Sequence, residues 1–384
     1  MTKQDCSDSV VLIIDPRGLI SIDNKDVVSR NKKYAQCLFE SQPKRNTKLV
    51  SISGSSIEVG QKSVTNSFLI YNVSKPTLNI IKFAFLSALL IKKMKWKVEL
   101  LVAGDPWESY WSAYFLNKFL NKRIPIQTQV HGDIADPRWR RINFRNRTRY
   151  LFAKLFLTKT SSIRSVTKYQ AENLVNTFGI KREKIVVVPI PITVASKTVA
   201  LRSERPKTIG IIGRIHQDRG IWECIKLVRI LNSGAKDFKV VVIGDGPSKN
   251  KFLLNLESVI PKNRIIYLGQ LPESELRQAW KRIGVLVSMA PVESYGRVIR
   301  ESLIAGVPVW ATASAGVKDL MDNCKKGEVK LLDLSKSSAS LEKDFNSLLK
   351  TKVNSDFSKR FIKENNTYAA KLANSWINII NKSK

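Results

Sequence analysis

The chain has 384 residues, which is more than one ordinary domain and predicts two or three. Hydrophobic residues make up 43% and charged residues 25%, a balance that excludes disordered, collagen-like and low-complexity chains. Lys and Arg number 65 against 32 Asp and Glu, and the resulting net charge of +33 implies an anionic partner: nucleic acid, an anionic membrane or a phosphorylated substrate.

Short apolar runs rich in Val and Ile alternate with longer helical patterns along the whole chain. Several of these runs are continuous, which is typical of strands buried on both faces of a parallel sheet. This alternation predicts βαβ units and open, doubly wound α/β sheets. The predicted strands cover residues 10–15, 48–53, 98–104, 126–132, 162–168, 184–189, 208–214, 239–246, 264–269, 284–290 and 307–312. The predicted helices cover residues 29–40, 77–95, 108–121, 169–179, 219–233, 249–260, 273–281 and 297–305.

The alternation is interrupted once, where three prolines and scattered basic residues disfavour both helix and sheet. Residues 191–207 are therefore predicted to form a linker. It separates an N-terminal Rossmann-like domain, residues 1–190, from a C-terminal Rossmann-like domain, residues 208–355. The last segment, residues 356–384, has apolar side chains at a helical spacing and is predicted to be a helix that packs across the domain junction.

The four cysteines lie far apart, without the spacing of a zinc site or a disulfide framework, which favours a reducing compartment. The first residues are not built like a secretory signal. The longest apolar run, from Ile80 to Ile91, is interrupted by Lys82 and is shorter than the roughly 20 residues that span a bilayer. We therefore expect a cytoplasmic protein that is not integral to a membrane but can lie on one.

The strongest motif is APVESYGRVIRESLIAGVPVWAT, residues 290–312. A buried strand is predicted to end before it, and a helix to begin near Gly296 or Arg297 and to stop at Gly306. The backbone N–H groups at the start of this helix suit a phosphate. Glu293 in the loop and Glu301 one turn into the helix suit hydroxyl groups of a ribose and a sugar. The alternative is that both are ordinary first-turn acids stabilised by the helix dipole.

The run ESYGRVIRESLIAGVPV resembles the E-x7-E donor-site signature of retaining glycosyltransferases with the two-domain GT-B fold, in glycosyltransferase family 4 (group 1). The resemblance implies two Rossmann-like domains that face a central cleft. It also implies that Glu293 contacts the transferred sugar near its reacting face and that Glu301 binds the ribose of the nucleotide. The helix start that would bind the donor consists of Ser294, Tyr295, Gly296, Arg297 and Val298.

IGRIHQDRG, residues 212–220, follows the first predicted strand of the second half. Arg214 and Arg219 are five residues apart across a turn, so both can converge on one diphosphate, and guanidinium groups pair well with phosphate. The family pattern has Arg at the first position and usually Lys at the second, so Arg219 departs from it while keeping the charge. The alternative is that both are surface charges. His216, between them, is predicted to be solvated.

Other segments resemble further parts of the donor site. Gly244 and Gly246 resemble the family's G-x-G-P turn on the nucleotide side, although a G-x-G at a strand end is usually only a turn. Gly269 to Leu271 resemble the loop that frames the nucleobase, although a capped helix explains them equally well. His131 ends a strand of the first half, where the family has a His that approaches the donor sugar, and a buried core His is the alternative. The first strand–helix loop has Gly18 alone where the family often has a pair.

The resemblance implies transfer of a sugar from a nucleotide donor to an acceptor hydroxyl with retention of configuration. Arg214, Arg219 and the helix start would stabilise the charge that develops on the leaving diphosphate. No D-x-D sequence occurs, so no metal is expected, and no cofactor is expected because the nucleotide sugar is a substrate. The leaving phosphate would accept the proton of the acceptor in a same-face attack, and Glu293 would position the sugar.

Residues 138–168 hold ten Lys or Arg, no acid and several aromatic side chains. Such a segment can lie in a membrane interface, bind nucleic acid, or form a basic solvated face on a core helix. Many members of the resembled family use lipid-linked acceptors, which favours the membrane, and residues 81–97 provide a second basic and apolar segment. We therefore expect a peripheral protein on the inner face of an anionic membrane.

The sequence predicts a hexosyl-type glycosyltransferase that acts on a saccharide or lipid-linked acceptor in the synthesis of surface polysaccharide, lipopolysaccharide or glycolipid. An epimerase or inverting transferase of the same fold is an alternative, which the E-x7-E spacing disfavours. A basic nucleic-acid-binding protein is an alternative of another class, but no RRM, KH, helix-turn-helix or zinc pattern supports it.

Overall fold

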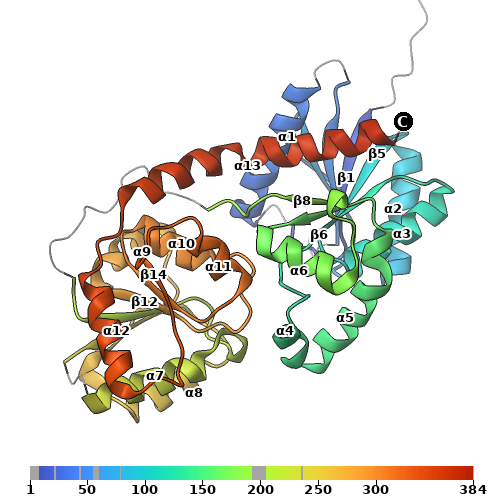
Figure 1. Ribbon diagram of the computed structural model, residues 1–384. Helices are drawn as coiled ribbons and strands as arrows, with labels where there is room; N and C mark the ends of the chain where they lie inside the picture. Colours follow the sequence, from blue (N-terminus) through green and yellow to red (C-terminus); the bar gives the residue numbers. More distant parts are fainter. Residues whose placement is uncertain are drawn as a thin grey trace, which may run out of the picture. The chain divides into compact units, whose positions relative to one another are not determined.

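The computed structural model describes residues 8–20, 23–42, 45–54, 60–77, 79–192, 205–234 and 237–383. The chain divides into two compact units (Figure 1). The N-terminal unit consists of Met1–Pro191 and Asn366–Lys384, and the C-terminal unit consists of Ile192–Asn365. Most of the linker predicted at 191–207 lies outside the described residues, because 193–204 are not among them.

The N-terminal unit contains an eight-stranded sheet in the order β3-β4-β2-β1-β5-β6-β7-β8. All neighbouring strands are parallel except β3 and β4, which pair antiparallel at one edge. The six strands predicted for this half are present, whereas β3 and β4 were not predicted. The strands are β1 Ser9–Asp15, β2 Lys48–Gly54, β3 Gly60–Thr65, β4 Phe68–Ser74, β5 Lys97–Ala103, β6 Ile126–Gln129, β7 Ser162–Ser165 and β8 Ile185–Val187.

Helices cover both faces of this sheet, and its central strand β1 is apolar at every position from Val10 to Ile14. In β1, Leu12 and Ile14 pack with α2 and α3, whereas Val11 and Ile13 pack with α1 and α13 on the opposite face. This alternation explains why the strand has no polar face. The helices are α1 Lys25–Ser41, α2 Ile80–Lys93, α3 Glu108–Leu120, α4 Pro137–Arg141, α5 Phe144–Phe156, α6 Lys168–Phe178 and α13 Ser355–Lys382.

The last helix, α13, begins within the C-terminal unit and ends within the N-terminal unit. Tyr368, Leu372, Trp376 and Ile380 form the buried stripe that the sequence predicts, and they complete the core beside α1. Trp376 is fully buried, and its Nε1 donates a hydrogen bond to Gln127 Oε1 at 2.7 Å. The end of the chain is therefore part of the N-terminal core.

The C-terminal unit contains a six-stranded, fully parallel sheet in the order β11-β10-β9-β12-β13-β14. The five strands predicted for this half are present, and β14 is additional. The strands are β9 Thr208–Ile212, β10 Lys239–Ile243, β11 Ile265–Tyr267, β12 Val285–Ser288, β13 Val309–Ala311 and β14 Val329–Leu331. Its helices are α7 Ile221–Gly234, α8 Lys249–Glu257, α9 Glu273–Ala279, α10 Arg297–Ile304, α11 Ala315–Met321 and α12 Ser338–Lys350.

Both sheets are doubly wound. The order of the C-terminal sheet is the 3-2-1-4-5-6 arrangement, in which the chain reverses direction between β9 and β12. In the N-terminal sheet the reversal lies between β1 and β5. Ligands of such sheets bind beyond the carboxyl ends of the strands at the reversal. Short 3₁₀ helices complete the structure: η1 Leu157–Lys159, η2 Arg182–Lys184, η3 Gln217–Arg219, η4 Lys262–Arg264 and η5 Trp280–Arg282.

None of the helices in the described part of the chain has the length and hydropathy that crossing a bilayer requires.

Candidate functional site

The loop between β12 and α10 contains the first Glu of the E-x7-E motif. The helix begins at Arg297 and ends before Gly306, close to its predicted bounds. Gly296 has a left-handed conformation, with φ at 74°, and a Cβ there would overlap the side chain of Ile299. Its N–H donates a hydrogen bond to Glu293 Oε1 at 3.0 Å. The carboxylate of Glu293 is thus held at the positive end of the helix.

The other oxygen of Glu293 pairs with Arg219, one of the two arginines that the sequence predicts to bind a diphosphate. Arg219, in η3 after β9, places its Nη1 3.0 Å from Glu293 Oε2. Since β9 and β12 are neighbours at the chain reversal, this ion pair joins the loops on the two sides of that point. Sequence positions 74 residues apart therefore meet where a doubly wound sheet binds its ligand.

Arg214 has a different carboxylate partner. Its Nη2 donates to Asp218 Oδ2 at 2.8 Å, and more than half of its side chain is exposed. His216, expected to be solvated, caps η3 by accepting a hydrogen bond from the Asp218 N–H, and its Nδ1 lies 2.7 Å from Asp218 Oδ1. The short turn folds the ring back onto its own backbone, and 30% of the His216 side-chain surface stays exposed. Arg214 and Arg219 thus lie in the same loop, each paired with an acid.

The predicted glycine turns lie at the ends of the neighbouring strands. A Cβ on Gly244 would overlap the carbonyl oxygen of Gly213, and one on Gly246 would overlap that of Ile215, so only glycine allows these loops to touch. The Gly244 N–H donates to the Gly269 carbonyl at 2.7 Å, which joins the ends of β10 and β11. Leu271, two residues beyond Gly269, is partly buried and lies in the sequence just before α9 begins at Glu273. The predicted donor residues therefore follow four adjacent strands.

The remaining motif residues differ in exposure. Ser294 and Tyr295 are buried, and the Tyr295 ring packs under the guanidinium of Arg300 at 3.9 Å, so its side chain supports the loop from within. Burial raises the pKa of the Tyr295 hydroxyl to about 12. Arg297 is exposed and Val298 partly buried. Burial also raises the pKa of Glu301, and Arg297, whose Nη2 is 3.7 Å from Glu301 Oε1, opposes that shift.

Two supports of this loop were not predicted from the sequence. The Gly316 N–H at the start of α11 donates to the Glu293 carbonyl at 2.7 Å, and a Cβ on Gly316 would lie 2.8 Å from the Tyr295 carbonyl carbon. The buried Arg300 forms an ion pair with Asp319 at 2.7 Å. The sequence S-A-G after a strand signals a helix start, but it does not indicate which loop that helix touches.

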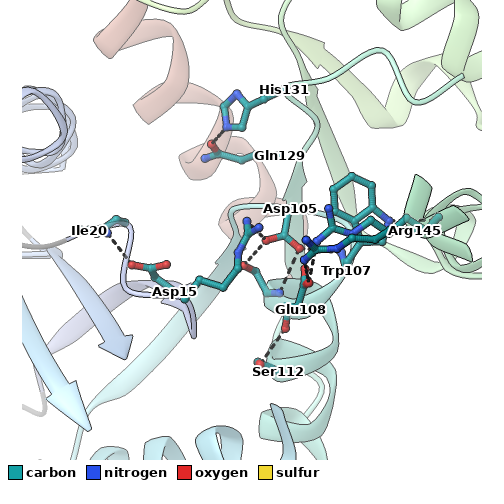
Figure 2. Close-up of polar contacts among 12 residues, drawn as sticks. Asp15, Ile20, Asp105, Trp107, Glu108, Ser112, Gln129, His131 and Arg145 are labelled. Carbon is teal, nitrogen blue, oxygen red and sulfur yellow. Dashed lines mark hydrogen bonds and ion pairs between the residues drawn. The ribbon is translucent and has the colours of Figure 1, made fainter. Parts of the chain in front are cut away.

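His131 follows β6 in the N-terminal unit, and its ring lies beside Gln129 (Figure 2). Its side chain reaches solvent, but protein atoms surround the ring closely enough to desolvate it. Its Nε2 lies 3.1 Å from Gln129 Oε1. Desolvation by the surrounding protein lowers the pKa of His131 below its ordinary value, and the cations Arg164 and Arg30 lower it further. The imidazole is therefore neutral at pH 7, a form that accepts or donates a hydrogen bond.

A polar cluster at the carboxyl ends of β1 and β5 was also missed (Figure 2). The buried Asp105 accepts hydrogen bonds from Arg17 Nη2 at 2.7 Å and from Ser109 Oγ at 2.8 Å. Glu108 pairs with Arg149 at 2.7 Å, and the Arg149 guanidinium stacks on Trp107 at 4.4 Å. Partners separated by 40 or more positions could not be matched from the sequence.

Burial alone would raise the pKa of Glu108, but its own N–H and Arg149 outweigh that effect and keep the pKa below its usual value. Burial raises the pKa of Asp15, against hydrogen bonds from Ile20, Leu19 and Ser53. Both acids lie at the chain reversal of the N-terminal sheet. The described residues contain no group of three or more His, Cys, Asp or Glu side chains arranged to hold a metal ion.

Comparison with known families identifies the second unit. Residues 195–367 match the model of a family described as glycosyl transferases group 1. The C-terminal unit is a group 1 glycosyltransferase domain. It contains the ion pair between Arg219 and Glu293 and the glycine turns described above.

Curated relatives match part of this chain over part of their own length. The chain is 27% identical over 175 residues to the 2-deoxystreptamine glucosyltransferase of Streptomyces kanamyceticus, covering 42% of this chain and 45% of that protein. It is 28% identical to the GDP-mannose-dependent alpha-mannosyltransferase of Corynebacterium glutamicum, covering 34% of this chain and 30% of that protein. The chain thus spans less than half the length of these relatives.

Solved structures match nearly the whole chain. The lipopolysaccharide outer core galactosyltransferase WaaB is 14% identical, with a TM-score of 0.65 over 94% of this chain and 98% of that one. HepE of Anabaena, solved in complex with UDP-glucose, is 14% identical, with a TM-score of 0.63 over 95% of this chain and 99% of that one. These likenesses show the GT-B fold, with two Rossmann-like domains.

Proposed function

We propose that the protein is a retaining, metal-independent glycosyltransferase that moves a hexosyl group from a nucleotide sugar to an acceptor hydroxyl. The observation that carries this proposal is the ion pair between Arg219 and Glu293 across the chain reversal of the C-terminal sheet. It joins a cation suited to a diphosphate to a carboxylate suited to sugar hydroxyls. The group 1 domain and its relatives, which are named as glucosyl and mannosyl transferases, support the same activity.

Binding of the donor would exchange the partners within this pair. A diphosphate carries more charge than a carboxylate and accepts paired hydrogen bonds from a guanidinium, so it would draw Arg219 away from Glu293. Glu293 would keep its hydrogen bond from the Gly296 N–H and turn its other oxygen to the sugar. The start of α10 and Arg214 would add positive potential at the leaving phosphate.

The remaining roles follow from position. Glu301 would accept the ribose hydroxyls, and the turns at Gly244, Gly246 and Gly269 would line the nucleotide. His131, neutral and solvent-accessible, would approach the donor sugar from the N-terminal unit. In a same-face attack the leaving phosphate would take the acceptor proton, so the mechanism requires no base, cofactor or metal of its own.

The acceptor and location follow from charge and from the structural neighbours. The net charge of +33 and the basic segment 138–168 suit an anionic membrane, where lipid-linked saccharides are extended. A structural neighbour is named as a lipopolysaccharide galactosyltransferase. These observations support the proposal that the protein acts on the cytoplasmic face of a membrane, in the synthesis of surface polysaccharide, lipopolysaccharide or glycolipid.

The first prediction tests the carboxylate of Glu293. Glu293→Gln keeps an oxygen that accepts the Gly296 N–H but removes the charge, so the loop conformation should persist. Because charge on the sugar ring develops in the transition state, we expect donor turnover to fall at least about 100-fold. Binding of UDP or GDP should become equal or tighter, because Arg219 loses its competing partner. Donor turnover is measured with a panel of UDP-, GDP- and ADP-sugars, and binding by calorimetry.

Glu273→Gln is the matched control, because Glu273 is also paired with an arginine at 3.0 Å but on the exposed surface of α9. Unchanged turnover in Glu293→Gln would remove this residue from the mechanism. The anomeric configuration of the product, followed by NMR, separates the proposed retaining reaction from an inverting transferase. Release of an epimerised donor would support the epimerase instead.

A further inference from the structure

Most exposed hydrophobic side chains of the described residues gather on three helices of the N-terminal unit. Fourteen large hydrophobic residues are exposed among all described residues, and nine of them lie on α2 with its C-cap, α3 and α5. Single exposed apolar residues are ordinary, but a concentration of this kind marks an interaction surface. The nine are Ile81, Phe85, Leu89, Met94, Tyr114, Phe144, Leu151, Phe152 and Leu155.

On each outer helix these side chains form one stripe. In α2, Ile81, Phe85 and Leu89 recur every four residues and are about half exposed, while the opposite stripe is buried against the sheet. In α5, Leu151 and Leu155 are also four residues apart, with 59% and 60% of their surface exposed. A spacing of four places side chains on one side of a helix. Each of the two helices therefore has an apolar stripe that stays roughly half exposed to solvent.

Helix α3 packs beside α2 (Figure 1), and its aromatic rings contact both outer helices. The Phe85 ring of α2 contacts Phe119 of α3 at 5.6 Å, and the Trp111 ring of α3 contacts Phe156 of α5 at 4.2 Å. Between them, Phe115 packs against Trp111 at 5.9 Å and is only partly buried. Ring contacts thus run from the α2 stripe through α3 to Phe156, the residue after Leu155 of the α5 stripe. We term the two stripes and this aromatic ridge together the apolar face.

The charges on the same helices indicate its partner. Together α2, α3 and α5 hold eight Lys or Arg and a single acid, Glu108. That acid is paired with Arg149 and Arg145 and so does not offset the remaining cations. Exposed cations flank the apolar stripes: Lys82, Lys92 and Lys93 on α2, Lys118 on α3, and Lys154 on α5. Lys118 also lies over the Tyr114 ring at 5.7 Å.

We propose that the apolar face inserts into the interface of an anionic lipid bilayer, with its flanking lysines against the headgroups. The inference rests on the membrane location proposed above and names the surface responsible. When a helix lies in the membrane interface, its half-exposed apolar side chains reach the boundary between headgroups and acyl chains. The aliphatic part of each flanking lysine then extends along this surface, so that its ammonium group reaches the lipid phosphates. A protein partner of the same shape would need acids to match the cations, whereas an anionic bilayer supplies them everywhere on its surface.

The second prediction tests this surface by co-sedimentation of the full chain with vesicles. Vesicles of phosphatidylcholine with phosphatidylglycerol should bind the protein, and pure phosphatidylcholine should bind it far more weakly. Leu151→Gln with Leu155→Gln should reduce binding at least about tenfold, because two exposed leucines no longer leave water. Lys92→Gln with Lys93→Gln should reduce it about fivefold or more, and raised salt should remove that difference.

Leu254→Gln is the matched control, since Leu254 is 67% exposed on α8 of the C-terminal unit. Thermal melting and donor turnover with a soluble acceptor show whether each variant folds. Equal binding of the leucine double variant and the control would overturn the inference, as would equal binding to neutral and anionic vesicles. A concentration-dependent dimer that the leucine variant abolishes, without vesicle binding, would assign the face to a second copy and overturn it too. Because sedimentation requires no catalysis, its outcome is independent of Glu293→Gln.

Discussion

Arg219 and Arg277 form ion pairs of the same length in different settings. Each guanidinium lies 3.0 Å from a glutamate oxygen, but Arg277 pairs along the exposed face of α9, whereas Arg219 pairs across the chain reversal of the sheet. Exposed ion pairs add about 0–1 kcal/mol to stability, so neither is needed for folding. Replacing each arginine in turn therefore tests whether the position of Arg219, and not the loss of an ion pair, affects ligand binding.

The third prediction is that Arg219→Gln weakens binding of a nucleoside diphosphate about 10- to 100-fold, the loss of one hydrogen-bonded charge. Arg219→Lys should bind with an intermediate affinity, because the ammonium keeps the charge but not the paired geometry. Arg277→Gln serves as the control and should bind like the unmodified protein. Calorimetry with UDP and GDP measures all three. If Arg219→Gln and Arg277→Gln bind equally well, Arg219 does not contact the diphosphate.

At the scale of elements, α11 holds the loop of residues 293–295 in place. Its first turn donates the Gly316 N–H to the Glu293 carbonyl, and the absence of a side chain there lets the helix lie directly against the backbone of residues 293–295. The contacts are with backbone atoms, which cannot turn aside as a flexible side chain can. The position of Glu293 thus depends on a residue 23 positions later in the sequence.

The fourth prediction is that Gly316→Ala displaces this loop. Its Cβ would lie 2.8 Å from the Tyr295 carbonyl carbon and 2.9 Å from the Glu293 carbonyl oxygen, so either the loop or the helix must shift. Overpacking of this kind costs about 1–3 kcal/mol. We expect donor turnover to fall at least about tenfold, since small displacements of a positioned group are costly. Lys318→Ala, an exposed change on the same helix, is the control. Full activity of Gly316→Ala would show that the loop adapts.

At the scale of elements, the sequence predicts a strand, helix or contact only where neighbouring residues form the pattern that identifies it. The strands at 239–246 and 284–290 were predicted because their apolar runs are continuous, and the helix after Glu293 because Gly296 and Gly306 bound it. The antiparallel β3 was missed because GQKSVT has no apolar pattern. Helices α4 and α5 were read as a charged segment, since their arginines obscure the apolar spacing. Gly316, Asp105 and Arg149 were missed because their partners are distant in sequence.

At the scale of the whole molecule, the last helix makes the stability of the N-terminal unit depend on the end of the chain. The α13 residues Leu372 and Trp376 are fully buried with α1 and β1, more than 300 positions earlier in the sequence. Tyr34 of α1 meets the Trp376 ring edge-on at 5.9 Å. The core of this unit therefore cannot be complete before the last residues have folded, and contacts between distant segments slow folding.

The fifth prediction is that Trp376→Ala destabilises the N-terminal unit by about 3–5 kcal/mol, the cost of removing a large buried aromatic side chain. The change also leaves Gln127 Oε1 without the indole N–H that it accepts at 2.7 Å, which adds to the loss. Hydrogen exchange should show faster exchange in β1, β2 and α1 and unchanged protection in β9 and β12, because those strands lie in the other unit. Asn378→Ala, exposed on the same helix, should leave all of these unchanged. Equal loss of protection in both units would mean that they unfold as one, and that α13 stabilises the whole molecule and not only the N-terminal core.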